Sequence, residues 1–156
     1  MELQPDYRDI LAAFATHGVD YLLVGGHAVG LHGQPRFTKD LDLWIRPTVD
    51  NLTRARRALV DFGAPDALLC HLDSAAPEDV LWMGTPPLRI DLVKGVPGGD
   101  FEAAWRGRLQ TSWDGVAVSV VGLDDLIALK RASGRPQDLV DADALEFARR
   151  SGAHAE

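Results

Sequence analysis

The sequence predicts an α/β domain, in which a small mixed β-sheet has helices packed against it. Short apolar runs bounded by glycine or proline are typical of buried strands, and they are interspersed with segments whose apolar residues recur at helical spacing. The length of 156 residues fits one domain, and 46% hydrophobic with 25% charged residues is ordinary for a globular protein. We therefore treat residues 1–156 as one domain, with a core at about 19–95 and C-terminal helices within 123–150.

The first half of the chain is predicted to contain three helices and two strands. These are a helix over 7–17, a strand over 21–24, a short helix over 28–31, a strand over 40–45 and a helix over 49–62. Glycines follow the last apolar residues of both long helices, where glycine commonly ends a helix. The glycine pair Gly25 and Gly26 closes the first strand, and Gly33 and Pro35 break the short helix.

The second half is predicted to contain two hairpins. We expect strands over 67–71, 80–83, 88–93, 109–113 and 116–121, and helices over 101–105, 123–133 and 137–150. The Asp114-Gly115 pair between two strands is a strong hairpin signal, and the Gly-Thr-Pro-Pro segment at 84–87 indicates the other hairpin. Acidic residues in its first turn and basic residues in its last turn favour the helix over 123–133, because both suit the helix dipole.

Two carboxylates share one face of the strand over 40–45. Because side chains alternate along a strand, Asp40 and Asp42 point to one face and the apolar residues between and after them to the other. Neighbouring carboxylates repel each other, and a divalent cation such as magnesium, which prefers carboxylate oxygens, is the usual remedy. The same alternation is also typical of any half-exposed strand. Asp91 would by itself be a solvated edge residue, but as a third acid beside the pair it would complete a metal-binding triad.

The glycine pair and Lys130 are candidate phosphate contacts. A strand, a glycine turn and a helix start expose unpaired N–H groups and the positive end of a helix dipole, and glycine lets a ligand approach the backbone closely. Gly25 and Gly26 are therefore candidates for holding phosphate, ahead of a helix that starts near His27. Lys130 falls on the apolar stripe of its helix, where it either extends along its own stem to the surface or points at a phosphate.

Charge and composition disfavour several functional classes. The net charge of −7 argues against general binding of duplex DNA, whose affinity comes from neutralised phosphates, but leaves room for an RNA end held locally. The arginines of the helix over 49–62 either contact RNA or form a solvated face. No run is long and apolar enough for a membrane span, the N-terminus lacks a signal pattern, and the single Cys70 suits a reducing compartment, so we expect a cytoplasmic protein. The five histidines lack zinc spacing and are interpreted as structural or surface groups.

The glycine pair and the three acids together resemble the nucleotidyltransferase superfamily built on the DNA polymerase β catalytic fold. That family carries Gly-Gly or Gly-Ser, a short helix, an apolar-Asp-apolar-Asp-apolar strand and a third Asp on a later strand. Gly25 and Gly26, then Asp40 and Asp42, and finally Asp91 match these positions. Gly26 stands where the family often has Ser, so that one side-chain contact to phosphate would be replaced by backbone.

The C-terminal part carries a less specific likeness. The segment from Asp125 to Asp141 is similar to the end of small bacterial members, among them the abortive-infection (AbiEii-type) nucleotidyltransferase toxins, in which a helix lysine and a later Asp complete the site. Lys130 and Asp138 match those two residues, but Gln137 stands where the toxins usually have Arg. The chain is also shorter than most of those toxins.

The resemblance implies an enzyme that transfers a nucleoside monophosphate from an NTP to a hydroxyl acceptor and releases pyrophosphate. The implied catalytic and metal-binding residues are Asp40, Asp42 and Asp91, and the implied nucleotide-binding residues are Gly25, Gly26 and Lys130. The implied cofactor is Mg²⁺, as two ions, with Mn²⁺ as a substitute. The acceptor would be transfer RNA or a protein for a toxin with a cognate antitoxin, or an aminoglycoside or lincosamide for an antibiotic-modifying enzyme.

The residues themselves disfavour two other classes of protein. A non-catalytic nucleotide-binding module would bind nucleotide without releasing pyrophosphate, but retention of all three acids favours an enzyme. A dinucleotide-binding domain is disfavoured because residues 25–30 lack the G-x-G-x-x-G spacing and the chain lacks regular βαβ alternation. The absence of a G-K-[ST] triplet excludes a Walker-type site.

Overall fold

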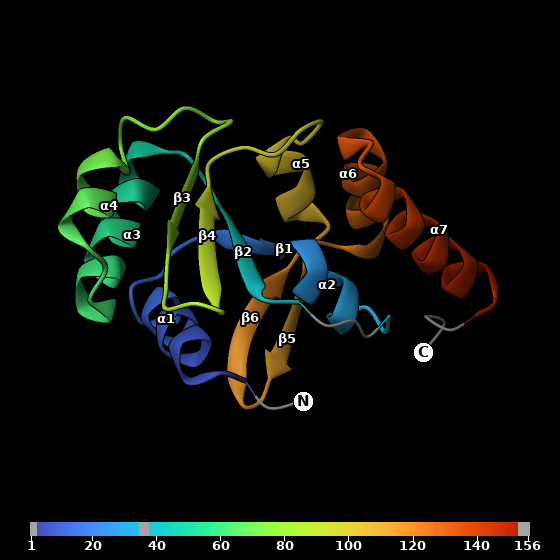
Figure 1. Cartoon of the computed structure of the whole chain (residues 1–156), viewed down its shortest axis with the longest axis horizontal. Helices are drawn as coiled ribbons and strands as arrows, with labels where there is room; N and C mark the ends of the chain where they lie inside the picture. The colour runs from blue at the N-terminus through green and yellow to red at the C-terminus, as the bar shows by residue number, and fades with distance from the viewer. Residues whose placement is uncertain (1–2, 35–37, 153–156) are drawn as a thin grey trace.

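The computed structural model describes residues 3–34 and 38–152, which form a six-stranded mixed sheet and seven helices (Figure 1). The strand order is β3-β4-β2-β1-β6-β5. The strands are β1 (Tyr21–Val24), β2 (Asp40–Ile45), β3 (Val80–Met83), β4 (Arg89–Val93), β5 (Leu109–Trp113) and β6 (Val116–Val120). The helices are α1 (Pro5–Thr16), α2 (Gly25–Leu31), α3 (Val49–Phe62), α4 (Asp66–His71), α5 (Phe101–Arg106), α6 (Leu123–Ser133) and α7 (Pro136–Arg150).

Parallel and antiparallel pairings both occur in the sheet. β1 lies antiparallel to β2 and parallel to β6, and β2 lies parallel to β4. The hairpins β3–β4 and β5–β6 are antiparallel and form its two edges. All four residues of β1 are buried, as expected for a central strand that is covered on both faces.

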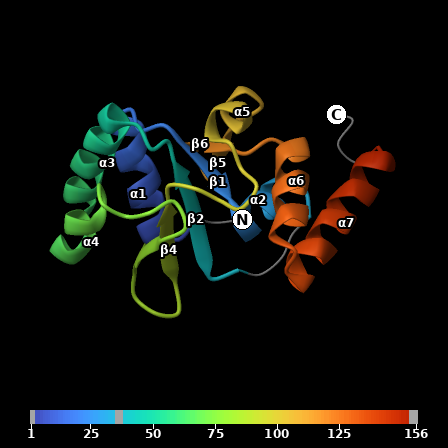
Figure 2. The same cartoon turned by 90° about the horizontal axis from the view of Figure 1, so that it is seen from above.

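The helices form two groups on either side of the sheet. α1, α3 and α4 lie at one side, and α6 and α7 lie together at the other (Figures 1 and 2). The inward face of α1 contributes Ile10, Leu11 and Phe14, which have no exposed surface. On β2 the apolar side chains alternate into the same core, and Leu41 and Leu43 are also fully buried.

Local signals explain how α3 is placed. Thr48 accepts a hydrogen bond from Asn51 N–H at its start, and Gly63, with φ of 95°, ends it in the left-handed conformation. Asn51 is fully buried, and its amide donates to the carbonyl oxygens of Asp20 and Arg46 at 2.9 Å each. These two residues flank β1 and β2, so this side chain fixes the ends of both central strands.

Most of the predicted elements are confirmed to within two residues, and two predictions are wrong. Residues 67–71 were expected to be a strand but belong to α4, because Pro65 precedes the first turn and the segment Ala-Leu-Leu-Cys has no β-branched residue to favour a strand. α2 begins at Gly25 and not after the glycine pair, so the two glycines form its first turn. The helix break expected at Pro35 lies outside the described residues.

None of the helices in the described part of the chain combines the length and the hydropathy that crossing a bilayer would require.

Candidate active site

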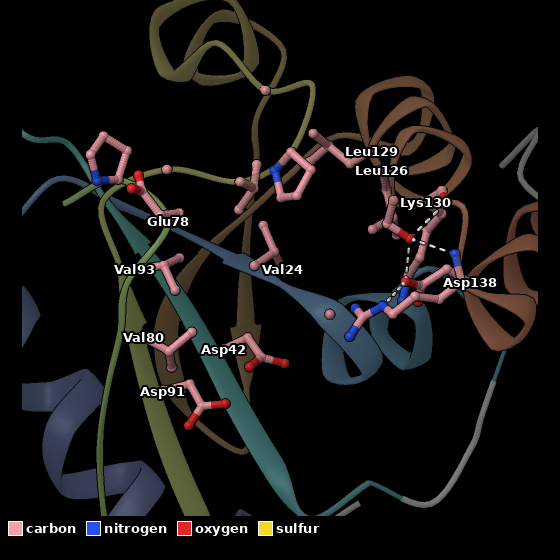
Figure 3. Close-up of a pocket in the computed structure, with 18 residues that line it drawn as sticks. Val24, Asp42, Glu78, Val80, Asp91, Val93, Leu126, Leu129, Lys130 and Asp138 are labelled. Atoms are coloured by element: carbon pink, nitrogen blue, oxygen red, sulfur yellow. Dashed lines mark hydrogen bonds and ion pairs between the residues drawn. The ribbon is translucent and has the colours of Figure 1, made fainter.

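Asp42 and Asp91 are brought together by the parallel pairing of β2 with β4. The register places Asp42 opposite Asp91, so both side chains leave the same face of the sheet from neighbouring strands. Figure 3 shows the two carboxylates pointing into one cavity, with Lys130 and Asp138 on its opposite wall. The predicted convergence of these two acids is therefore present.

The Asp42 carboxyl keeps its proton to an unusually high pH. Burial raises the pKa of Asp42 to about 7, and the negative charge of Asp91 and a hydrogen bond to it act in the same direction. Asp91 is 8% exposed and accepts a 2.7 Å hydrogen bond from Arg89 Nε, so one of its oxygens has a cation beside it. The Asp42 carboxyl thus has another acid opposite it, and negative charge accumulates at this point of the sheet.

Asp40 lies next to this pair without joining it in the cavity. It is half-buried, stands opposite Arg89 in the register, and its charge also raises the pKa of Asp42. The cavity is lined by Asp42 and Asp91 but not by Asp40. Among the residues that the structure describes, no three His, Cys, Asp or Glu side chains form a group ready to hold a metal ion.

The glycine pair is required by close packing of α2 against the acid strand. Gly25 has φ of 74°, and a Cβ at this position would lie 2.1 Å from Asp42 Oδ2 and 3.0 Å from its Cγ. A Cβ on Gly26 would lie 3.1 Å from the Cβ of Thr38. Any side chain at Gly25 would therefore displace the Asp42 carboxylate, which ties this glycine directly to the geometry of the acids.

The cavity has a volume of about 700 Å³, within the range of small-molecule and cofactor sites. Its sheet wall consists of the acid pair and the end of β1 at Val24 and Gly25. Its other walls come from residues in the segments 77–80 and 95–99, from α6, from the turn between α6 and α7, and from the start of α7. The predicted Gly25 and Lys130 both line it, whereas Gly26 does not.

Lys130 is buried at the helical wall and held there by two carboxylates. Its Nζ lies 3.0 Å from Asp138 Oδ1 and 3.2 Å from Asp141 Oδ2, and all three side chains are less than 10% exposed. Lys130 therefore does not extend to the surface along its own stem, which was one of the two alternatives that the sequence left open. The charge of Lys130 also reaches across the cavity, since it lowers the pKa of Asp42.

Donors that the sequence did not single out complete this cluster. Ser133 Oγ donates to Asp138 Oδ2, and Arg135 Nε donates to the same oxygen at 2.8 Å. Although burial raises it, the pKa of Asp138 lies below its ordinary value because the hydrogen bonds from Ser133, Lys130 and Arg135 stabilise the ionised form. The signal for this cluster was the i, i+3 spacing of Asp138 and Asp141, which puts both on one face of α7.

His27, which follows the glycine pair, is a packing residue and not a cavity residue. Its ring centroid lies 5.5 Å from that of Tyr7 and 5.1 Å from that of Trp113. Burial lowers the pKa of His27 to about 4, so the ring is neutral at neutral pH. This agrees with the structural interpretation of the histidine from the sequence.

Comparisons with known proteins identify the fold. No family model matches the chain, and no curated protein matches it in sequence. A crystal structure from Thermotoga maritima, assigned provisionally as a nucleotidyltransferase, is 12% identical, covers 96% of both chains and has a TM-score of 0.58. An antigenic nucleotidyltransferase-like protein from Paracoccidioides brasiliensis is 18% identical over 92% of this chain and 77% of its own, with a TM-score of 0.50. Together with the mixed sheet, these likenesses confirm the predicted fold class.

Proposed function

We propose that this chain, which has a nucleotidyltransferase fold, transfers a nucleoside monophosphate from an NTP to a hydroxyl acceptor. The observation that carries the proposal is the in-register pair Asp42 and Asp91 at a cavity of about 700 Å³. Two carboxylates side by side at a cavity, one of them with a raised pKa, suit acid–base and cation chemistry.

The acid pair suits divalent cations by its chemistry. Carboxylate oxygens are the donors that magnesium prefers, and the raised pKa of Asp42 reflects negative charge that a cation would offset. Asp42 and Asp91, with Asp40 beside them, would hold two Mg²⁺ ions, or Mn²⁺ in their place. Such ions, when bound, would supply the positive charge that offsets the negative charge developing during transfer.

The protein's own residues then divide the remaining work. The acceptor oxygen forms a bond to the α-phosphorus, the bond from that phosphorus to the β-phosphate oxygen breaks, and pyrophosphate leaves with the electron pair. Asp91 takes the proton of the acceptor hydroxyl. Lys130 and the 78% exposed Arg135, both at the cavity, offset the negative charge of the triphosphate. Gly25 and Gly26 allow the triphosphate to approach the start of α2.

The biological setting follows from the likeness of the C-terminal part to AbiEii-type toxins. We infer a toxin that modifies transfer RNA or a protein and is held in check by a cognate antitoxin. Its need for NTP places it in the cytoplasm. Growth arrest on expression, relieved by a neighbouring gene, supports the toxin, whereas a raised inhibitory concentration of an aminoglycoside or lincosamide would instead make it an antibiotic-modifying enzyme.

The direct test incubates the protein with each α-labelled NTP, Mg²⁺ and either total RNA or cell extract. We expect label in an acceptor and an equal amount of released pyrophosphate. Asp42→Asn should abolish both and retain the fold, while Asp143→Asn, which removes a 77% exposed carboxylate from α7, should leave both unchanged. Turnover in Asp42→Asn would refute the assignment, and nucleotide binding without pyrophosphate release would indicate a non-catalytic module.

A further inference from the structure

Trp82 is an exposed aromatic residue on the same face of the sheet as the acid pair. It lies on the edge strand β3 and is 59% exposed. Along β3 the side chains alternate, so Met83 is buried in the core while Val80, on the face of Trp82, lines the cavity. The indole therefore stands in water beside the cavity.

The strand register places Trp82 at the end of a row that contains both acids. Val24 on β1 is opposite Asp42 on β2, Asp42 is opposite Asp91 on β4, and Asp91 is opposite Trp82 on β3. Side chains directly opposite each other on neighbouring strands have Cβ atoms about 5 Å apart. Trp82 is thus one strand beyond Asp91, on the side away from α2 and Lys130.

Arg89 connects the indole to the acids. Its guanidinium carbon lies 5.0 Å from the centroid of the Trp82 ring, and its Nε donates to Asp91 Oδ1 at 2.7 Å. The cation covers one side of the ring, and the exposed remainder is open to a second planar group. A tryptophan, an arginine and a carboxylate in contact form a continuous surface from the edge of the sheet to the reacting centre.

We propose that Trp82 stacks on an unpaired nucleobase of the acceptor, so that the acceptor is the end of a single-stranded RNA or a free nucleotide. This inference rests on the proposed function. The candidate triphosphate contact Gly25 follows Val24, at the other end of the row from Trp82, which leaves the Trp82 end for the acceptor. Base–aromatic stacking and a nearby arginine for the phosphate are the features by which proteins hold single strands. In a chain of net charge −7, such local contacts take the place of a basic surface.

The test separates binding from transfer. Trp82→Ala, Trp82→Phe and wild type are compared for binding to a short single-stranded RNA, to a blunt duplex of the same sequence and to AMP. Transfer from a labelled NTP to the same single strand is then measured. Phe147→Ala is the matched control, since it removes a 73% exposed aromatic side chain from α7.

We expect Trp82→Ala to weaken binding of the single strand by about 5- to 150-fold and to raise KM for the RNA by a similar factor. KM for the NTP should not change. Trp82→Phe should keep most of the affinity, and the duplex should bind weakly to all variants. An effect on the RNA alone identifies an RNA end as the acceptor, and an equal effect on AMP identifies a free nucleotide.

Equal binding of the single strand by Trp82→Ala and wild type overturns the inference. Transfer to a protein hydroxyl or an aminoglycoside that is unchanged in Trp82→Ala also overturns it, while nucleotidyl transfer itself stands. A change in the oligomeric state of Trp82→Ala in solution, with unaltered RNA binding, would assign the indole to a contact between two copies. That result also overturns the inference. RNA binding that depends on Trp82, without any transfer by wild type, supports the stacking and contradicts the proposed function instead.

Discussion

Asp42 and Asp91 line the sheet wall of the cavity, and a second pair, Asp138 at the helical wall and Asp141 beside it, contacts Lys130. The two pairs differ in whether a cation of the protein contacts both carboxylates. In the second pair, the pKa of Asp138 lies below its ordinary value. On the sheet wall burial and the charge of Asp91 raise the pKa of Asp42 to about 7. Among the described residues, no cationic side chain forms an ion pair with the Asp42 carboxylate.

This difference separates carboxylates whose charge the protein balances from a pair that needs a ligand. The helical cluster is complete as it stands, since each buried charge has an opposite charge and further donors. On the sheet wall Arg89 contacts Asp91 alone, and the charge of Asp42 is left to a proton or an external cation. Perturbed acids of this kind, at a cavity, are typical of functional sites.

The largest expected effect is on catalysis at the sheet wall. Asp91→Asn should lower the rate of transfer by about 10³-fold or more, because the pair would lose both a cation ligand and the group that takes the acceptor proton. Circular dichroism should show an unchanged fold. Asp138→Asn, on the other wall, should lower the free energy of unfolding and leave the rate of transfer per folded molecule nearly unchanged. The comparison fails if Asp91→Asn unfolds the chain while Asp138→Asn leaves its stability intact.

Removal of the built-in cation should affect stability most. Lys130→Met leaves two buried carboxylates without their shared partner, and we expect it to lower the free energy of unfolding by about 3–5 kcal/mol. Denaturant unfolding measures this. Arg131→Ala, which breaks an exposed ion pair one residue along α6, should cost less than about 1 kcal/mol. Equal costs for the two variants would show that burial of the Lys130 cluster does not matter.

A methyl group at Gly25 should disturb the sheet wall alone. Gly25→Ala puts a Cβ within 2.1 Å of Asp42 Oδ2 at a positive φ, so the carboxylate must move. We expect a loss of about 1–3 kcal/mol in stability and about 10- to 100-fold in rate. Gly30→Ala is the control on the same helix, because a Cβ there meets nothing within 4 Å. It should be neutral or slightly stabilising, and wild-type transfer by Gly25→Ala would argue against the close contact with Asp42.

The last effect, which is the smallest over a single pH unit, is a pH dependence of opposite sign at the two walls. Asp42 keeps its proton to about pH 7 in the folded chain but only to about pH 4 when unfolded, so the free energy of unfolding should fall as pH rises through this window. The slope should be about 1 kcal/mol per pH unit or less, and it should be absent in Asp42→Asn. Asp138 should act in reverse, with stability lost as acid protonates it. Parallel pH profiles for wild type and Asp42→Asn, measured by thermal unfolding without metal, would contradict the raised pKa of Asp42.

The sequence predicts the faces of single elements better than the contacts between them. The alternation of β2 correctly put Asp42 on the polar face, and the periodicity of α6 correctly put Lys130 on the inner stripe. That Asp91 stands opposite Asp42 depends on the parallel register of β2 with β4, which no local pattern determines. The partners of Lys130 depend on the turn at Gly134, whose φ of 70° sets how α7 returns against α6.

Two residues show where pattern and structure diverge. Asp40 and Asp42 are equivalent in the sequence pattern, yet only Asp42 lines the cavity. Asp42 is opposite Val24 at the end of β1, whereas Asp40 lies beyond that end of β1. Trp82 was not singled out, since an exposed aromatic on a strand has no distinctive local signal, and only the four-strand row reveals its position beside Asp91.

The position of a bound cation tests most directly which pair of aspartates needs an external cation. Crystals grown with Mn²⁺ and a non-hydrolysable NTP analogue would be measured for anomalous scattering at the manganese edge. The account predicts manganese peaks in contact with Asp42 and Asp91 and none at Asp138 and Asp141. Bound nucleotide with manganese at the helical wall, or with no manganese beside Asp42, would contradict it.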